Sequence, residues 1–162
     1  MKTSIVSSLL ASVASLATAS VIPRQHGFVP ANSCCFTLHD ASTGNAIRED
    51  RTYGALELGG GNADGWFCID LSGDDDAGIL RDEAKNACFV APDNEVKCHD
   101  QLPGPQTWAL VGGGKDGAKK VTYDGEDTYK ACSEGGYESV WSAEKGGCRE
   151  FKIEARGFQG AC

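Results

Sequence analysis

The stretch KKVTYDGEDTYKAC, residues 119–132, contains the pattern that decides the fold. Two short runs, Lys119–Tyr123 and Thr128–Ala131, stand on either side of the dipeptide Asp124-Gly125. Both runs contain β-branched and aromatic residues, and alternation of apolar with polar residues is typical of a half-buried strand. Asp-Gly between two such runs is a hairpin signal, because both residues accept the positive φ of a tight turn. The stretch therefore predicts antiparallel strands.

The same pattern recurs along the chain from Phe36 onward. Many short strands with regular turns predict an all-β fold, a disulfide-stabilised antiparallel β-sandwich or barrel. One segment, Asp82–Ala87, is a helix candidate, although it is too short to be stable alone. Further hairpin dipeptides are Asp116-Gly117, Gly135-Gly136 and Gly146-Gly147. The remaining expected strands are Phe36–His39, Tyr53–Leu58, Trp66–Leu71, Ala87–Val90, Glu95–His99, Thr107–Val111, Tyr137–Ser142 and Arg149–Ala155.

The N-terminus has the features of an export signal. Lys2 provides the positive start, Ile5–Leu16 is largely apolar, and Ala17-Thr18-Ala19 has small residues at the positions that a signal peptidase inspects. We expect residues 1–19 to be a signal peptide, 20–33 a flexible leader with a second processing point after Arg24, and 34–162 a single cysteine-rich β domain. The apolar run is too short to span a bilayer.

The net charge limits the classes of partner that this protein is expected to bind. The chain has 15 Lys plus Arg and 23 Asp plus Glu; removing Lys2 with the signal leaves 14 minus 23, or −9. Such a surface repels nucleic acid and anionic lipid, so we expect neither as a partner. It suits an acidic extracellular medium, in which part of the carboxylate charge is neutralised.

Cysteine usage indicates a disulfide framework. The chain has eight cysteines, all after the signal: Cys34, Cys35, Cys68, Cys88, Cys98, Cys132, Cys148 and Cys162. Because a bridge between the neighbours Cys34 and Cys35 would strain the peptide between them, we expect each to bind a different distant partner. Our provisional pairing joins Cys88 to Cys98 across a hairpin, and Cys132 or Cys148 to the N-terminal pair. Without a Cys-x-x-Cys motif, a metal site is disfavoured.

The C-terminal part resembles a known family. The resemblance covers residues 34–162, mainly after Ile79, and rests on Ile79–Val90, Glu95–Asp100, Trp108–Leu110, Gly117, Val121–Gly125, Tyr129–Cys132, Ser139–Trp141, Cys148, Phe151–Ala155 and Cys162. Their order is similar to the C-terminal domain of fungal cell-wall mannoproteins with internal repeats (PIR proteins). That family is joined to wall β-1,3-glucan through the glutamine of an Asp-Gly-Gln repeat. The nearest stretch here, residues 53–61, has no glutamine, so we expect association by disulfide or adhesion instead.

Aromatic residues provide the candidate glycan contacts. A pyranose can stack on an exposed ring, and we keep Trp141 and Trp66 as candidates, with Trp141 the more exposed. Core packing is the favoured interpretation for the tryptophans as a set, and it is the expectation for Trp108.

Catalytic signals are weak. His39-Asp40 and His99-Asp100 could meet across a sheet, but no motif supplies a nucleophile. The acidic stretch Asp70–Asp76 does not fit an EF-hand loop and is interpreted as a solvated loop. We therefore assign no catalytic residue, cofactor or metal.

Three functions follow as hypotheses. The first is a secreted, non-enzymatic structural or adhesive protein of the fungal cell wall, with wall polysaccharide as its partner. The second is a secreted effector that binds a host surface protein or glycan. The third is a small secreted hydrolase or ribonuclease.

Overall fold

The chain folds into two antiparallel β-sheets in a sandwich-like arrangement. The computed structural model describes residues 27–71, 78–100, 102, 107–112, 117–142 and 147–162. In these ranges the larger sheet has eight strands in the order β7-β6-β5-β4-β1-β13-β9-β8, and the smaller has five in the order β12-β10-β11-β3-β2. None of the described residues forms an α-helix, and none belongs to a helix that could cross a membrane.

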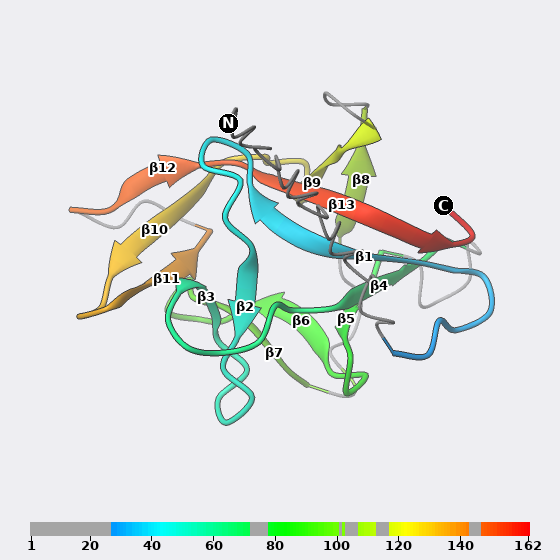
Figure 1. The fold of residues 1–162 in the computed structure, drawn as a ribbon, viewed down its shortest axis with the longest axis horizontal. Helices are drawn as coiled ribbons and strands as arrows, with labels where there is room; N and C mark the ends of the chain where they lie inside the picture. The colour runs from blue at the N-terminus through cyan, green and yellow to red at the C-terminus, as the bar shows by residue number, and fades with distance from the viewer. Residues whose placement is uncertain (1–26, 72–77, 101, 103–106, 113–116, 143–146) are drawn as a thin grey trace, which may run out of the picture.

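The strands are short, except for the two at the centre of the larger sheet. β1 (Ser33–Asp40) and β13 (Ile153–Gly160) each have eight residues and run side by side across the molecule (Figure 1). The rest of this sheet is β4 (Phe67–Asp70), β5 (Leu80–Asp82), β6 (Ala87–Val90), β7 (Val96–Asp100), β8 (Trp108–Val111) and β9 (Lys119–Tyr123). The smaller sheet comprises β2 (Ile47–Glu49), β3 (Leu56–Gly59), β10 (Tyr129–Ser133), β11 (Tyr137–Trp141) and β12 (Arg149–Phe151).

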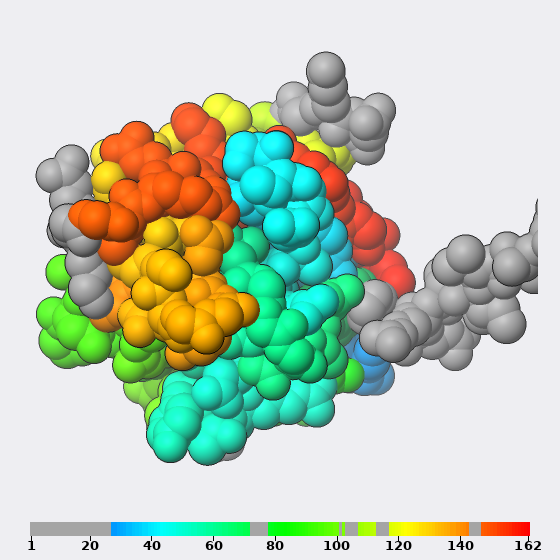
Figure 2. All heavy atoms as spheres, turned by 60° about the vertical axis from the view of Figure 1, so that its left-hand side comes forward, coloured from blue at the N-terminus to red at the C-terminus, as the bar shows by residue number. Residues whose placement is uncertain are grey.

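Both sheets contribute to one hydrophobic core. Phe36 and Leu38 from β1 pack with Ile153 from β13, and the smaller sheet adds Tyr129 and Val140. In the second half of β1, Thr37 and His39 alternate with Phe36 and Leu38 and are more exposed, as the period of two in a half-buried strand requires. Figure 2 shows the C-terminal strands, in orange, lying directly beside the segment that follows β1, in cyan. There the Ala41 amide donates to the Lys152 carbonyl at 2.9 Å.

Most expected strands are present, but β2 and β5 were not predicted. The helix expected over Asp82–Ala87 is wrong. Asp82 ends β5, Lys85 has a φ of +71°, and the chain turns directly into β6. The Asp82 carboxylate accepts hydrogen bonds from the Asn86 backbone and side chain, and these bonds stabilise a tight turn rather than a helix.

The Asp124-Gly125 turn has a different role from the one predicted. Both residues have positive φ, 52° and 83°, as the dipeptide suggested. However, β9 belongs to the larger sheet and β10 to the smaller, so this turn carries the chain between sheets instead of closing a hairpin. Gly135-Gly136 does connect the paired strands β10 and β11. Gly147 lies between β11 and β12, which do not pair with each other because they flank β10 on opposite sides, so it is not in a hairpin. Asp116 and Gly146 lie outside the described residues.

All eight cysteines form bridges within the chain. The pairs are Cys34–Cys162, Cys35–Cys68, Cys88–Cys98 and Cys132–Cys148. Separate partners for the two neighbouring cysteines, and the bridge across the β6–β7 hairpin, are therefore confirmed.

The predicted link from Cys132 or Cys148 to the N-terminal pair is wrong for a topological reason. β1 lies between β4 and β13, so Cys35 faces Cys68 and Cys34 faces the end of β13. Cys132 lies on β10 in the other sheet.

The structure also locates the start of the domain. Ser33 is the first residue of β1, and Val29 packs against Trp66 and the Cys35–Cys68 bridge. Residues 27–33, part of the expected leader, thus lie against the β domain. The expected signal peptide, the processing point after Arg24, and Asp74–Asp76 of the acidic stretch lie outside the described residues.

Candidate functional site

Two adjoining depressions are both lined by Trp66. The first, which we call the acidic cleft, has a volume of about 360 Å³; the second, the Phe28 groove, has about 540 Å³. Both are lined by Trp66, Asp82, Glu83 and Ala84, so they share one wall. Both volumes fall in the range of small-ligand sites, and because the two depressions adjoin, we take this region as the candidate functional site.

The acidic cleft lies where the two sheets meet. Glu49 ends β2 of the smaller sheet, whereas Asp82 ends β5 of the larger sheet. The loop before β4 closes the cleft, and its Gly65 amide donates to the Ile47 carbonyl at 3.1 Å. A Cβ at Gly65 would clash with the Phe67 ring, so the close approach of this loop requires glycine.

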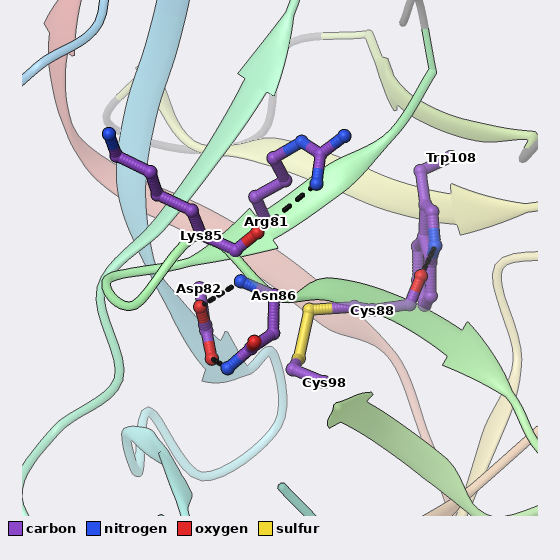
Figure 3. The surroundings of a disulfide bond; sticks show 7 residues. All are labelled: Arg81, Asp82, Lys85, Asn86, Cys88, Cys98 and Trp108. Carbon is purple, nitrogen blue, oxygen red and sulfur yellow. Dashed lines mark hydrogen bonds between the residues drawn. A yellow bond between two sulfur atoms is a disulfide. The ribbon is translucent and has the colours of Figure 1, made fainter. Parts of the chain in front are cut away.

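Asp82 is held in place by hydrogen bonds. It is only 4% exposed; its Oδ1 accepts from the Asn86 backbone amide at 2.7 Å and its Oδ2 from Asn86 Nδ2 at 2.9 Å (Figure 3). Glu83, the next residue, instead forms a solvent-exposed ion pair with Arg51 at 2.9 Å. The buried Asp82 carboxylate is therefore fixed by Asn86. The nearby Arg51 guanidinium pairs instead with the exposed Glu83 carboxylate.

Glu49 is the most perturbed acid of the cleft. Burial, together with the charge of Asp82 and a hydrogen bond between the two carboxyl groups, raises the pKa of Glu49 to about 8. The Arg51 charge opposes this shift, and the Glu83 charge adds to it. This shift favours protonated Glu49 at neutral pH, a form that can donate a hydrogen bond to the Asp82 carboxylate and leaves one negative charge on the pair.

The Phe28 groove differs from the cleft in having an exposed aromatic ring. Phe28 is 79% exposed at the rim, and Trp66, Cys68 and Ile79 contribute buried apolar surface. Charged groups of both signs complete the lining: Asp70, Arg81, Glu83 and Lys85. Arg81 is oriented by donating to the Lys85 carbonyl at 3.1 Å (Figure 3). The groove thus combines an apolar face with hydrogen-bond donors and acceptors.

The tryptophans do not form exposed platforms. Trp141 is 7% exposed, which is more than Trp66 as expected, but it is still buried, and it donates from Nε1 to Ser139 Oγ at 2.8 Å. Trp66 is 3% exposed. Trp108 is a core residue, as expected, and donates to the Cys88 carbonyl at 2.7 Å (Figure 3). Neither Trp66 nor Trp141 presents a free ring face to a pyranose.

The structure does not bring the histidines together. His39 lies on β1 and His99 on β7, with β4, β5 and β6 between them in the same sheet. The His39 ring is occupied by Thr37 Oγ1 at 2.8 Å and the Gly44 carbonyl at 3.1 Å. His26 lies outside the described residues.

Among the described residues, no group of three or more His, Cys, Asp or Glu side chains is arranged to hold a metal ion.

The comparisons with known proteins return no match. No protein-family model, no curated protein and no solved structure matches this chain. The resemblance to PIR mannoproteins accordingly remains a prediction from the sequence.

Proposed function

We propose that this protein is a secreted, non-enzymatic, structural or adhesive component of a fungal cell wall, and that it holds wall polysaccharide through the Phe28 groove. The disulfide framework supports an extracellular location, because bridges persist in oxidising compartments. The wall assignment rests on the PIR-like order of motifs in the second half of the sequence.

Adhesion is preferred over attachment by a bridge. All eight cysteines are paired within the chain, so no thiol is free to join another wall protein. Residues 53–61, the stretch nearest to the family's repeat, also contain no glutamine for an ester to glucan. A non-covalent contact is the remaining mode of association.

The observation that carries the proposal is the exposed ring of Phe28 at the edge of a polar groove. An aromatic ring can cover the apolar face of a pyranose, while carboxylates accept from sugar hydroxyls and guanidinium or ammonium groups donate to them. Phe28, Glu83 and Arg81 supply these three kinds of group in one groove.

Co-sedimentation with insoluble polysaccharides tests this contact. Wild-type protein is incubated with β-1,3-glucan, chitin and mannan particles, and the bound fraction is measured as a function of particle concentration. We expect saturable binding to one of them, and about tenfold weaker binding after Phe28→Ala, a loss equivalent to about 1.4 kcal/mol. The matched control is Tyr137→Ala, which removes an aromatic ring that is 40% exposed on β11 and outside the groove. Equal binding of all three proteins, or no binding, contradicts the proposal.

Fractionation of the producing organism separates the wall role from the effector role. A wall component held by adhesion remains in washed cell walls and is released by hot detergent without a reducing agent. A protein found only in the culture filtrate supports the effector hypothesis instead.

A further inference from the structure

We propose that Glu49 and Asp82 form a proton-operated clamp between the two sheets, in which one shared proton holds β2 against β5 and its loss releases this contact. This inference concerns the state of the fold around the acidic cleft, and it does not depend on polysaccharide binding.

The geometry places the pair across the seam between the two sheets. β2 is the edge strand of the smaller sheet, and its backbone also bonds to the loop before β4 through the Gly65 amide and the Arg48–Asp64 bridge. No ladder joins β2 directly to β5, which lies between β4 and β6, so Glu49 and Asp82 supply a buried side-chain link between these two strands, beside the exposed Arg51–Glu83 ion pair. Both side chains line the acidic cleft, whose shape therefore depends on their contact.

The charged side chains that face Glu49 and Asp82 do not include a cation that is free to neutralise them. Asp64 comes from the loop before β4, Glu83 from the turn after β5 and Arg51 from the turn after β2. Arg51 is 75% exposed and engaged with Glu83, and Asp64 is 3.4 Å from Arg48. Since no unengaged cation lines the cleft, two ionised carboxylates in contact would repel each other, and a shared proton removes that repulsion.

The direction of the pH effect follows from proton linkage. The pKa of Glu49 is about 8 in the folded protein, compared with an ordinary value of 4.5. Between these values the folded state retains a proton that the unfolded state has lost, so the clamp stabilises most at acidic pH. Its contribution declines as pH rises above about 4.5 and is lost above about 8.

Thermal unfolding across pH 5 to 9 tests the clamp with three proteins. In the wild type we expect the midpoint temperature to fall steadily to about pH 8. Glu49→Gln keeps a donor for Asp82 but cannot ionise, so we expect a flatter profile and a midpoint above wild type at pH 8.5. The control is Glu126→Gln, which removes an exposed carboxyl outside the acidic cleft and should retain the wild-type profile. Parallel profiles for wild type and Glu49→Gln overturn the proposal.

Two measurements distinguish the clamp from a general effect on stability. Carboxyl-carbon NMR of the wild type reads the titration of Glu49 directly and needs no variant; a midpoint near 4.5 overturns the proposal. Amide hydrogen exchange, expressed as protection relative to Glu49→Gln at the same pH, reports on β2. We expect protection of β2 to decrease above pH 8 in the wild type only; equal protection in the two proteins contradicts release of the strand.

Discussion

A buried aspartate joins the two sheets at each of two places, and the two differ in their partners. Asp40, at the end of β1, is fully buried and lies 2.8 Å from Arg149 of β12. Asp82, at the end of β5, instead contacts Glu49 of β2. We call these the arginine seam and the proton seam.

The partner determines how each seam responds to pH. Burial raises the pKa of Asp40, but hydrogen bonds from Ser42 and the Arg149 guanidinium outweigh it, so the net pKa is lowered. At the proton seam the pKa of the partner Glu49 is raised. The arginine seam therefore weakens as acid protonates Asp40, and the proton seam weakens as base removes the shared proton. One fold thus contains opposite pH responses at two strand ends of the larger sheet, because Asp40 faces a cation and Asp82 faces an acid.

The largest effect is expected from the covalent frame that supports both seams. Cys34 and Cys162 are 128 residues apart, and a loop of that length corresponds to about 5 kcal/mol in the chain-entropy model. The double variant Cys34→Ala/Cys162→Ala should lose roughly this much stability in urea unfolding while keeping both pH responses. Loss of either response would mean that the bridge, and not the side chains of the two seams, determines how the stability depends on pH. The matched control is the Cys88→Ala/Cys98→Ala pair, whose shorter separation of 10 predicts a smaller loss of about 3 kcal/mol.

Breaking the arginine seam is the next largest change. Arg149→Met leaves the Asp40 carboxylate buried without a cation, with the Ser42 hydrogen bonds at 2.8 and 2.7 Å remaining. We expect the free energy of unfolding to fall by about 2 kcal/mol at pH 7. This is less than for a fully buried ion pair, because the Arg149 side chain is 36% exposed. Arg149 also pairs with Glu138, so Glu138→Gln is the control that removes only that contact. Equal losses in the two variants would show that Asp40 has no special role.

The dependence of stability on pH below about pH 4 tests the arginine seam separately from the proton seam. Because the folded pKa of Asp40 lies below its ordinary 3.8, its contribution is complete above that pH and is lost as pH falls through the folded value. Wild type should therefore lose stability below about pH 4, and Arg149→Met should lose less over the same range. Urea midpoints measured from pH 2 to 6 check this, and a steeper acidic limb in the variant would contradict it.

The smallest expected effect is the coupling between the seams. The two aspartates share no hydrogen-bond or ion-pair partner among the described contacts, so the variants Arg149→Met and Glu49→Gln should be additive within about 0.5 kcal/mol. A double-mutant cycle at pH 7 measures this. A larger coupling would mean that the sheets move as one unit around both seams.

The sequence reveals local features of this fold more readily than the contacts between distant segments. Ala87–Val90 and Lys119–Tyr123 are strands with the bounds that their patterns predicted. The Cys88–Cys98 bridge was also predictable, because it closes one hairpin. The Cys34–Cys162 bridge depends on β13 lying beside β1, and no local pattern contains that strand order.

The proton seam could not be found in the sequence for a similar reason. β2 has only three residues and no clear alternation, and Asp82 belongs to a segment that suggested a helix. Glu49 and Asp82 are also far apart in the chain and lie in different sheets. A visible signal was Gly65, whose lack of a Cβ permits a close approach, but glycine is frequent in this chain, with 21 residues, and the signal is weak.

The bridge between Cys34 and Cys162 has a mechanical consequence. It closes almost the whole described domain into a ring, so tension applied on either side of these two cysteines passes through a sulfur–sulfur bond and bypasses the sheets. Under load such a domain does not lengthen by unravelling, in contrast to a sandwich that is pulled through its terminal strands. In a stretched polymer network it would behave as an inextensible link until that bond is reduced.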